Sequence, residues 1–237
     1  MKHLKTTKTT ISYKYRDAKK LTPAIIRKAK WPRDIKFLCF EPDGGVMKMD
    51  RPLKLGVPWH KFSGGVIFMQ KRDALPAQVF NGGKSSLRAV TLKGGRKLSS
   101  LYTSSQNRYY NVVWKGLLGR HMKEESRTFN RESLPKLTGC TVNNGRRPVA
   151  LVAGDKYKVK LLGTFAWFIT WIWIDPALKG PMRDKARSMI IDWLRKRPLK
   201  HLVAYVNTFN IPSQKFFLKL GFKPIRLVFY ERDGIGS

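Results

Sequence analysis

The run FAWFITWIWI, residues 165 to 174, constrains the fold of this chain more than any other stretch. Every residue in it except one threonine is apolar. A membrane-spanning helix needs roughly 20 consecutive apolar residues, about twice this length, whereas a short continuous apolar run is typical of a strand buried on both faces. We therefore predict one or two buried strands within residues 161–175 and no membrane partner.

The elements on either side of this run indicate the class of fold. Residues 183–197 place apolar side chains at helical spacing, with lysine and arginine on the opposite face. The expected elements, in order, are a strand at 148–153, a turn at 154–156, the buried strand or strands at 161–175, a helix at 183–197, a strand at 201–207, a helix beginning near 210 and a strand at 224–232. Strands and helices that alternate in this way predict a fold of the α/β class. We expect its helices to pack on a mixed sheet, in an α+β arrangement.

The stretch NIPSQKFFLKLGF, residues 210 to 222, carries its own helix boundaries. Asn210 is a residue type that caps helix N-termini, and Pro212 suits the first turn. Gly221 supplies a left-handed exit from the helix. Three apolar residues recur on one face and are expected to meet the sheet: Phe216, Phe217 and Leu220.

The charge of the chain predicts a polyanionic partner. Lysine and arginine number 48 against 15 acidic residues, for a formal net charge of +33. Solubility alone does not require such an excess, whereas neutralising phosphates needs about one cation per contact. We expect residues 1–110 to form a basic N-terminal region that contacts DNA or RNA and contributes first strands at 35–40 and 64–69, and residues 111–237 to form the core.

The remaining composition points to the inside of a cell. Cys39 and Cys140 are the only cysteines, which excludes a disulfide framework and a cysteine-rich zinc module. No histidine and carboxylate pair has the spacing of a metal site, so no metal is expected. The N-terminal residues lack the apolar segment of a secretory signal. The expected location is therefore cytoplasmic, in association with nucleic acid.

Residues 148–232 resemble the GNAT superfamily of N-acetyltransferases. In that family a loop of pattern R/Q-x-x-G-x-G/A after a buried strand binds the coenzyme A diphosphate at a helix N-terminus; here Arg183, Ala186 and Ser188 stand at its key positions. A second pattern is N-x-x-A-x-x-[FY]-Y-x-x-x-G-F, and this chain has Asn210, Ser213, Phe216, Phe217, Gly221 and Phe222 at that spacing, with serine and phenylalanine in place of the alanine and the tyrosine. The resemblance implies a GNAT-like fold that binds acetyl-CoA or another acyl-CoA, with its diphosphate at the start of a helix over 186–197. The implied cofactor-binding residues are Arg183, Lys185, Ala186, Arg187, Ser188, Asn210, Ser213 and Phe217.

The chain departs from the family at one chemical position. Many members have a tyrosine that protonates the departing thiolate, and this tyrosine would fall at Phe217, which has no proton to give. Tyr205 and Tyr230 are the nearest alternative acids in the sequence, although both also suit strand packing. The other readings are that the thiolate leaves to solvent, or that the chain keeps the fold without the activity.

Histidine is the natural general base for an amine acceptor because imidazole titrates near neutral pH. His121 stands beside Glu124 and Glu125 in a chain with few acids, which makes it a catalytic candidate; His60 is the other histidine considered. Both residues are equally consistent with surface or turn positions.

Together these features predict an acyl-CoA-dependent N-acyltransferase acting on nucleic acid or on an amine that nucleic acid carries, such as a base or an aminoacyl-tRNA. One alternative is a catalytically inactive GNAT-fold protein that binds nucleic acid or a ribonucleoprotein. Another is adenine modification of phage DNA, as in the Mom-type proteins, although Asn207 and Phe217 occupy the region of their characteristic elements.

Overall fold

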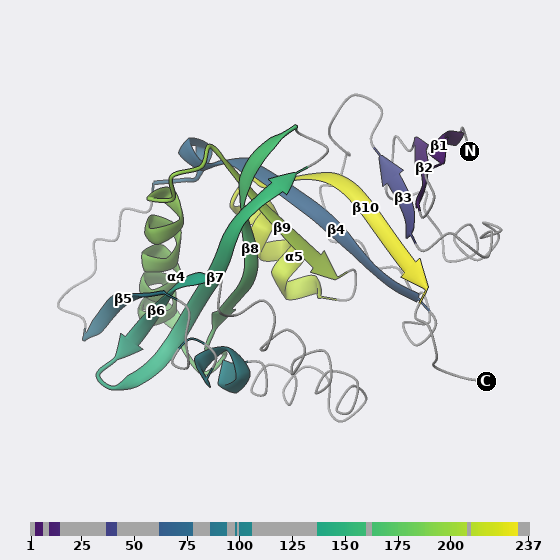
Figure 1. Cartoon of the computed structure of the whole chain (residues 1–237). Helices are drawn as coiled ribbons and strands as arrows, with labels where there is room; N and C mark the ends of the chain where they lie inside the picture. The colour runs from purple at the N-terminus through teal and green to yellow at the C-terminus, as the bar shows by residue number, and fades with distance from the viewer. Residues whose placement is uncertain are drawn as a thin grey trace. The chain divides into compact units, whose positions relative to one another are not determined.

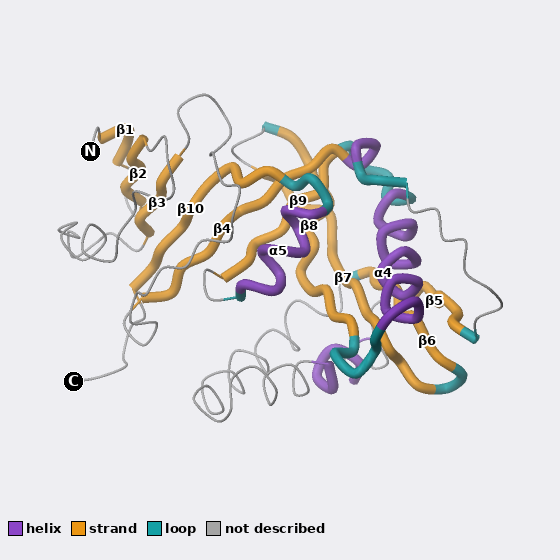
Figure 2. The backbone as a smooth tube through the Cα atoms, turned by 180° about the vertical axis from the view of Figure 1, so that it is seen from behind, coloured by secondary structure: helices purple, strands orange, loops and turns teal. Residues whose placement is uncertain are grey.

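The structure is a computed structural model that describes residues 3–6, 10–14, 37–41, 62–77, 86–93, 98, 100–105, 137–159, 163–207 and 210–231. These residues belong to two compact units, one formed by Met1–Pro76 with Val203–Ser237 and the other by Ala77–Leu202. Figures 1 and 2 show the elements from opposite sides. The candidates His60 and His121 lie outside the described residues.

The unit of residues 77–202 contains a four-stranded meander. Neighbouring strands pair antiparallel in the order β5-β6-β7-β8. The strands are β5 (Leu87–Lys93), β6 (Thr138–Asn144), β7 (Arg147–Val159) and β8 (Thr164–Ile174). The buried strand expected from FAWFITWIWI is confirmed as one strand, β8. The turn expected at 154–156 is wrong, because β7 continues through these residues to Val159.

The sheet of this unit is covered on both faces. On one face, Leu151 and Ala153 of β7 pack with Leu98, Tyr102, Leu137 and Trp173, and residues 98 and 100–105 are helical. On the other face lies α4 (Gly180–Arg195), whose Trp193 Nε1 donates a hydrogen bond of 3.1 Å to Thr91 Oγ1 of β5. Burial on both faces explains why β7 and β8 are apolar at consecutive positions rather than at alternate ones.

The other unit also contains a sheet, with the strand order β1-β2-β3-β10-β4-β9. The strands are β1 (His3–Thr6), β2 (Thr10–Lys14), β3 (Phe37–Glu41), β4 (Phe62–Lys71), β9 (His201–Asn207) and β10 (Lys223–Glu231), and a 3-10 turn, η2 (Arg72–Ala74), follows β4. The strands β2 and β3 are parallel and the β3–β10 and β10–β4 pairs are antiparallel, so the expected mixed sheet is confirmed.

The position of β4 in this sheet could not be read from the sequence. The strand expected at 64–69 exists, but it inserts between β10 and β9, two strands that are more than 130 residues later in the chain. Pairing partners at such separation depend on tertiary packing and leave no local signature. The predicted functional division into residues 1–110 and 111–237 stays a prediction.

The stretch 210 to 222 forms the capped helix expected from its sequence. In α5 (Ile211–Lys219) the Ser213 N–H donates to Asn210 Oδ1 at 3.2 Å. Gly221 has a φ of +78°, and the Phe222 N–H donates back to the Phe217 carbonyl at 3.0 Å. The expected apolar face is corrected at one position, since Gln214 and Phe217 are the buried residues of the helix and Phe216 is half-buried.

Removing the cap tests this local account. We expect Asn210→Ala to lower the free energy of unfolding by about 1 kcal/mol, because the Ser213 N–H loses its acceptor. Asn210→Asp keeps an acceptor oxygen and should retain most of the stability. Urea denaturation measures both variants; equal midpoints for Asn210→Ala and the unchanged protein would show that the cap contributes nothing.

Candidate functional site

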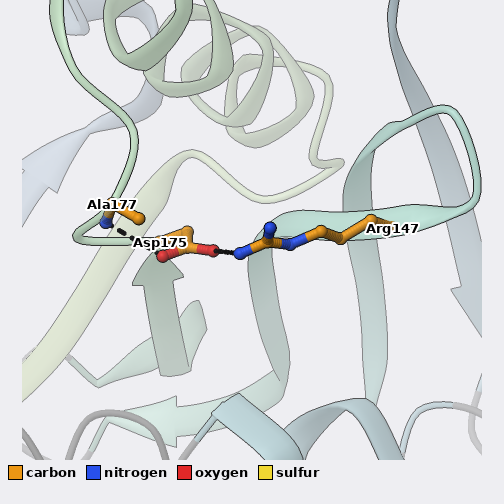
Figure 3. A network of polar contacts seen from close by, with 3 residues as sticks. All are labelled: Arg147, Asp175 and Ala177. Atoms are coloured by element: carbon orange, nitrogen blue, oxygen red, sulfur yellow. Dashed lines mark hydrogen bonds and ion pairs between the residues drawn. The ribbon is translucent and has the colours of Figure 1, made fainter.

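The junction between β8 and α4 is held by a buried carboxylate. Asp175, which follows the last residue of β8, has a side chain only 6% exposed. Its Oδ2 lies 2.8 Å from Arg147 Nη2, and its Oδ1 accepts a hydrogen bond of 3.0 Å from the Ala177 N–H (Figure 3). The Asp175 N–H donates to the Val149 carbonyl at 2.8 Å. These contacts fix the path of the chain from the strand into the helix.

The N-terminus of α4 is exposed and suited to an anion. The N–H groups of the first turn have no acceptor within the helix, and here these belong to Gly180, Met182 and Arg183, since Pro181 has none. The first turn contains no acidic residue, and the Lys179 side chain makes no capping bond. Because the helix dipole also favours negative charge, this turn has the chemistry of a phosphate site.

This arrangement corrects the expected position of the R-x-x-A-x-S pattern. The helix begins at Gly180, six residues before the expected start at Ala186. Ala186 is fully buried and Ser188 is 5% exposed, so both side chains pack in the core of the unit. Their backbone N–H groups lie far enough into the helix to be used by intrahelical hydrogen bonds. A diphosphate would therefore meet residues 180–183 rather than 186–188.

The charged residues of the pattern have different surroundings. Arg183 is exposed on the first turn of α4. Arg187 Nη2 lies 2.8 Å from Asp184 Oδ1 and is partly neutralised by it. Lys185 is half-exposed. Of the predicted cofactor-binding side chains in this helix, Arg183 therefore has the best access to an anion. A sequence signal for the true start was present, because proline in the first turn is typical of a helix N-terminus.

The strand β8 contains a bulge, that is, one residue without a partner in β7. Ala153 and Gly154 of β7 are consecutive, yet their partners in β8 are Trp171 and Ile169, so Thr170 is an extra residue in the strand. Gly154 is required at this point, since a Cβ there would lie 2.3 Å from the Phe168 carbonyl oxygen. Bulges of this kind are frequent beside active sites because they redirect backbone groups and side chains. The sequence signal was Gly154, which was assigned to a turn.

The tyrosine and phenylalanine candidates belong to the other unit. The Tyr205 ring lies against Gly65 of β4, where a Cβ would be 2.2 Å from the ring Cζ, and its hydroxyl is buried. Phe217 is 2% exposed, stacks on Phe68 with centroids 5.9 Å apart and meets the edge of Phe222 at 5.0 Å. Tyr230 lies in β10, and its side chain is outside the described residues.

Asn210 and Ser213 are joined by a hydrogen bond at the start of α5. The Asn210 side-chain oxygen caps α5 through the Ser213 N–H. Their predicted contacts with coenzyme A remain a prediction, and a helical cap is the role that their geometry demonstrates. Both residues are half-buried.

Cys140 is unsuited to act as a nucleophile. Its side chain is fully buried in β6, and burial raises the pKa of the thiol from 9.0 to about 11, although a backbone hydrogen bond at Val90 and the nearby Arg197 act in the opposite direction. The reactive form of cysteine is the thiolate, which is scarce at neutral pH when the pKa is this high. Partial burial of the Arg197 guanidinium lowers its own pKa, while the nearby Cys140 acts in the opposite direction.

Two other kinds of site are not found in the described part of the chain. No group of three or more His, Cys, Asp or Glu side chains gathers there in an arrangement that could hold a metal ion. No helix among these residues is long and apolar enough to cross a membrane.

Comparisons with known proteins give similarity of fold. No family profile and no curated protein matches the sequence. A functionally unknown conserved protein from Staphylococcus epidermidis ATCC 12228 is 9% identical with a TM-score of 0.51, over 84% of this chain and 73% of that chain. A tandem GNAT protein from the clavulanic acid biosynthesis pathway is 11% identical with a TM-score of 0.48, over 91% of this chain and 68% of its own.

A GCN5-related N-acetyltransferase from Ralstonia eutropha JMP134 is 12% identical with a TM-score of 0.45, over 64% of this chain and 97% of that chain. Among these three proteins, the Staphylococcus protein alone has a TM-score above 0.5, and at 9% identity that likeness shows a shared fold and nothing further. The α/β fold class expected from the sequence is confirmed.

The Asp175 contacts predict a specific loss of stability. We expect Asp175→Ala to lower the free energy of unfolding by about 2 kcal/mol, because the Ala177 N–H loses an acceptor and the Arg147 pair is broken. Asp184→Ala is the matched control: it breaks an exposed pair within α4 and should cost less than about 0.5 kcal/mol. Thermal unfolding compares the two; equal losses would mean that the junction depends on the backbone alone.

Proposed function

We propose that this chain is an acyl-CoA-dependent N-acyltransferase whose acceptor amine is carried by nucleic acid. The observation that carries the proposal is the β8–α4 junction, where a bulged buried strand leads through a fixed turn into an exposed, acid-free helix N-terminus. A base amine, as in Mom-type adenine modification, and the amine of an aminoacyl-tRNA are acceptors of this class.

Each end of the junction matches one end of the cofactor. The diphosphate of coenzyme A would accept hydrogen bonds from the backbone N–H groups of residues 180–183, with Arg183 and Lys179 supplying charge. Asp175 follows Thr170 by five steps along the strand, or about 16 Å at roughly 3.3 Å per residue. An extended pantetheine arm spans such a distance, so its thioester would lie near the bulge.

The bulge offers a way to stabilise the reacting carbonyl. An extra residue disrupts the regular ladder and redirects backbone N–H groups. A donor held rigidly near the thioester oxygen stabilises the negative charge that develops when the amine attacks. In the proposed step a C–N bond forms, the C–S bond breaks, the amine loses a proton and the thiolate gains one.

The proton that the amine loses needs an acceptor, and the departing thiolate needs a proton donor. His121 is the proposed base for the amine, because imidazole accepts a proton near neutral pH. Phe217 cannot protonate the thiolate. Tyr205 and Tyr230 are the proposed alternatives, and protonation by water is the third. The buried Tyr205 hydroxyl requires local opening before it can serve.

Charge is the reason for placing the acceptor on nucleic acid. The formal net charge of +33 provides many more cations than a small acceptor requires. Phosphate neutralisation uses them and releases condensed counterions, which makes such binding strongly dependent on salt. The basic residues before position 110 are proposed to make these contacts.

A second function is favoured by the surroundings of Phe217, Ala186 and Ser188. All three side chains are buried, which is what packing positions require and supports a structural role for them. The chain would then be an inactive acyltransferase-like scaffold that binds nucleic acid or a ribonucleoprotein. Coenzyme binding separates the two functions, since an intact site makes the melting temperature rise with acetyl-CoA.

Coenzyme binding should depend on the first turn of α4. We expect Arg183→Glu to weaken coenzyme A binding about tenfold or more, because a carboxylate replaces a cation beside the diphosphate. Arg195→Glu, an exposed reversal at the other end of the same helix, is the control and should change the affinity little. Calorimetry gives both dissociation constants. Equal affinities would remove the diphosphate from this turn, and no binding by the unchanged protein would favour the scaffold function.

The Phe217 position provides a separate test of catalysis. If a substrate thiolate reaches this side chain, Phe217→Tyr supplies a proton donor and should raise turnover. Because the ring is 2% exposed, a hydroxyl without a partner would instead cost about 1–3 kcal/mol of stability. Turnover and melting temperature are measured together. An equally stable variant with unchanged turnover and pH dependence would place the reacting sulfur elsewhere.

A further inference from the structure

The outer ends of β7 and β8 form a hairpin that exposes two aromatic rings. Tyr157 is 57% exposed and Phe165 is 44% exposed. Within the described residues only two other large hydrophobic side chains are comparably exposed, and both are aliphatic. Exposed aromatic surface is costly in water unless it serves a contact, so this hairpin is a candidate for binding.

The two rings lie on opposite faces of the hairpin. Lys158 is paired with Phe165 and Lys156 with Trp167, and because side chains alternate along a strand, these four residues share one face. Tyr157 is paired with Ala166 on the other face, where its ring meets Phe168. Both lysines therefore lie on the side of Phe165, and the Lys156 Nζ is 4.2 Å from the centroid of that ring.

The same face continues inward as an alternation of rings and cations. Trp167 meets the Trp193 ring edge-to-face, with centroids 6.0 Å apart. The Arg197 guanidinium lies 3.6 Å from the Trp193 centroid and 5.5 Å from that of Trp167. We define the aromatic-cationic stripe as Lys156, Lys158, Phe165, Trp167 and Arg197, all within one compact unit.

We propose that the aromatic-cationic stripe binds single-stranded nucleic acid, with one base stacked on Phe165 and the adjacent phosphates on Lys156 and Lys158. This inference rests on the nucleic-acid partner proposed above and adds the strand form and the place. Aromatic rings beside a cationic track are the general means of holding single strands, since every base has a face that can stack. In a duplex the base faces are already stacked on one another and are not available.

The cation over Phe165 does not block this role. An exposed ammonium on a phenylalanine ring is a weak contact, because water solvates the ammonium almost as well. Stacking of a base is the stronger interaction. A base that takes the ring face releases Lys156 to a phosphate, so the two interactions replace one another without leaving a charge unpaired.

Substitution of Phe165 tests the proposal directly. The probes are fluorescein-labelled oligo-dT, oligo-U and a DNA duplex, with affinity measured by anisotropy. We expect Phe165→Ala to weaken binding of both single strands about tenfold and to leave the duplex unchanged. Phe165→Trp should retain single-strand affinity. A difference between oligo-dT and oligo-U would identify DNA or RNA as the preferred strand.

Tyr157→Ala is the matched control, because it removes an even more exposed ring from the opposite face of the same hairpin. It should leave single-strand binding unchanged, and melting temperatures verify that both variants are folded. An unchanged affinity in Phe165→Ala, or an equal loss in Tyr157→Ala, would overturn the proposed surface.

The lysines give an independent readout. Lys156→Gln and Lys158→Gln should each reduce the slope of log affinity against log salt by about 0.7 for single strands. Unchanged slopes contradict phosphate contacts at the stripe even if the protein binds nucleic acid. Absence of binding by the unchanged protein overturns the nucleic-acid partner itself, whereas coenzyme A calorimetry tests the acyltransferase proposal separately.

Discussion

The antiparallel pairing of β7 with β8 is the interaction on which both proposed sites depend. It joins Ala150 to Ile174 at one end and Val159 to Thr164 at the other. Between these ends, residues 150–154 are buried on both faces of the sheet. The register is fixed at Gly154, because only glycine fits there: a Cβ would lie 2.3 Å from the Phe168 carbonyl oxygen. One register therefore determines the position of the bulge at Thr170, the turn at Asp175 and the exposed hairpin end.

Two charged side chains of this unit, Asp175 and Arg197, are buried or partly buried, and each makes contacts that compensate its charge. Asp175 is buried beside Arg147 and accepts a backbone hydrogen bond, so its negative charge is solvated by the protein. Arg197 is partly buried, and its guanidinium stacks on Trp193 while its Nε donates to the Trp193 carbonyl at 3.1 Å. The formal net charge of +33 remains a large excess of cations, and mutual repulsion among them opposes compactness. A polyanion that binds the folded chain relieves this repulsion and stabilises the protein by mass action.

Local features were predictable because their causes are local. The cap at Asn210, the exit at Gly221 and the burial of residues 165–174 follow from capping chemistry, glycine conformation and hydrophobicity within a few residues. The insertion of β4 between β9 and β10 was not predictable, because it joins distant segments. The start of α4 at Gly180 differs from the position that the R-x-x-A-x-S pattern predicts, although Pro181 is typical of a first turn. Gly154 was assigned to a turn because a glycine before an aspartate and a lysine suits both a turn and a bulge.

The same contrast applies to the chemistry. A residue in a sequence pattern can serve either catalysis or packing. The burial of its side chain distinguishes these two roles. Phe217 matches the family spacing, yet its ring stacks on Phe68 and meets Phe222, contacts that hold α5 on its sheet. A side chain committed to such packing contributes to stability whether or not a substrate reaches it. If acyl transfer occurs in this chain, the cofactor site at the α4 N-terminus can therefore be intact while proton donation has moved to another group or to water. The two functions proposed here differ in whether the coenzyme still binds and is used for acyl transfer.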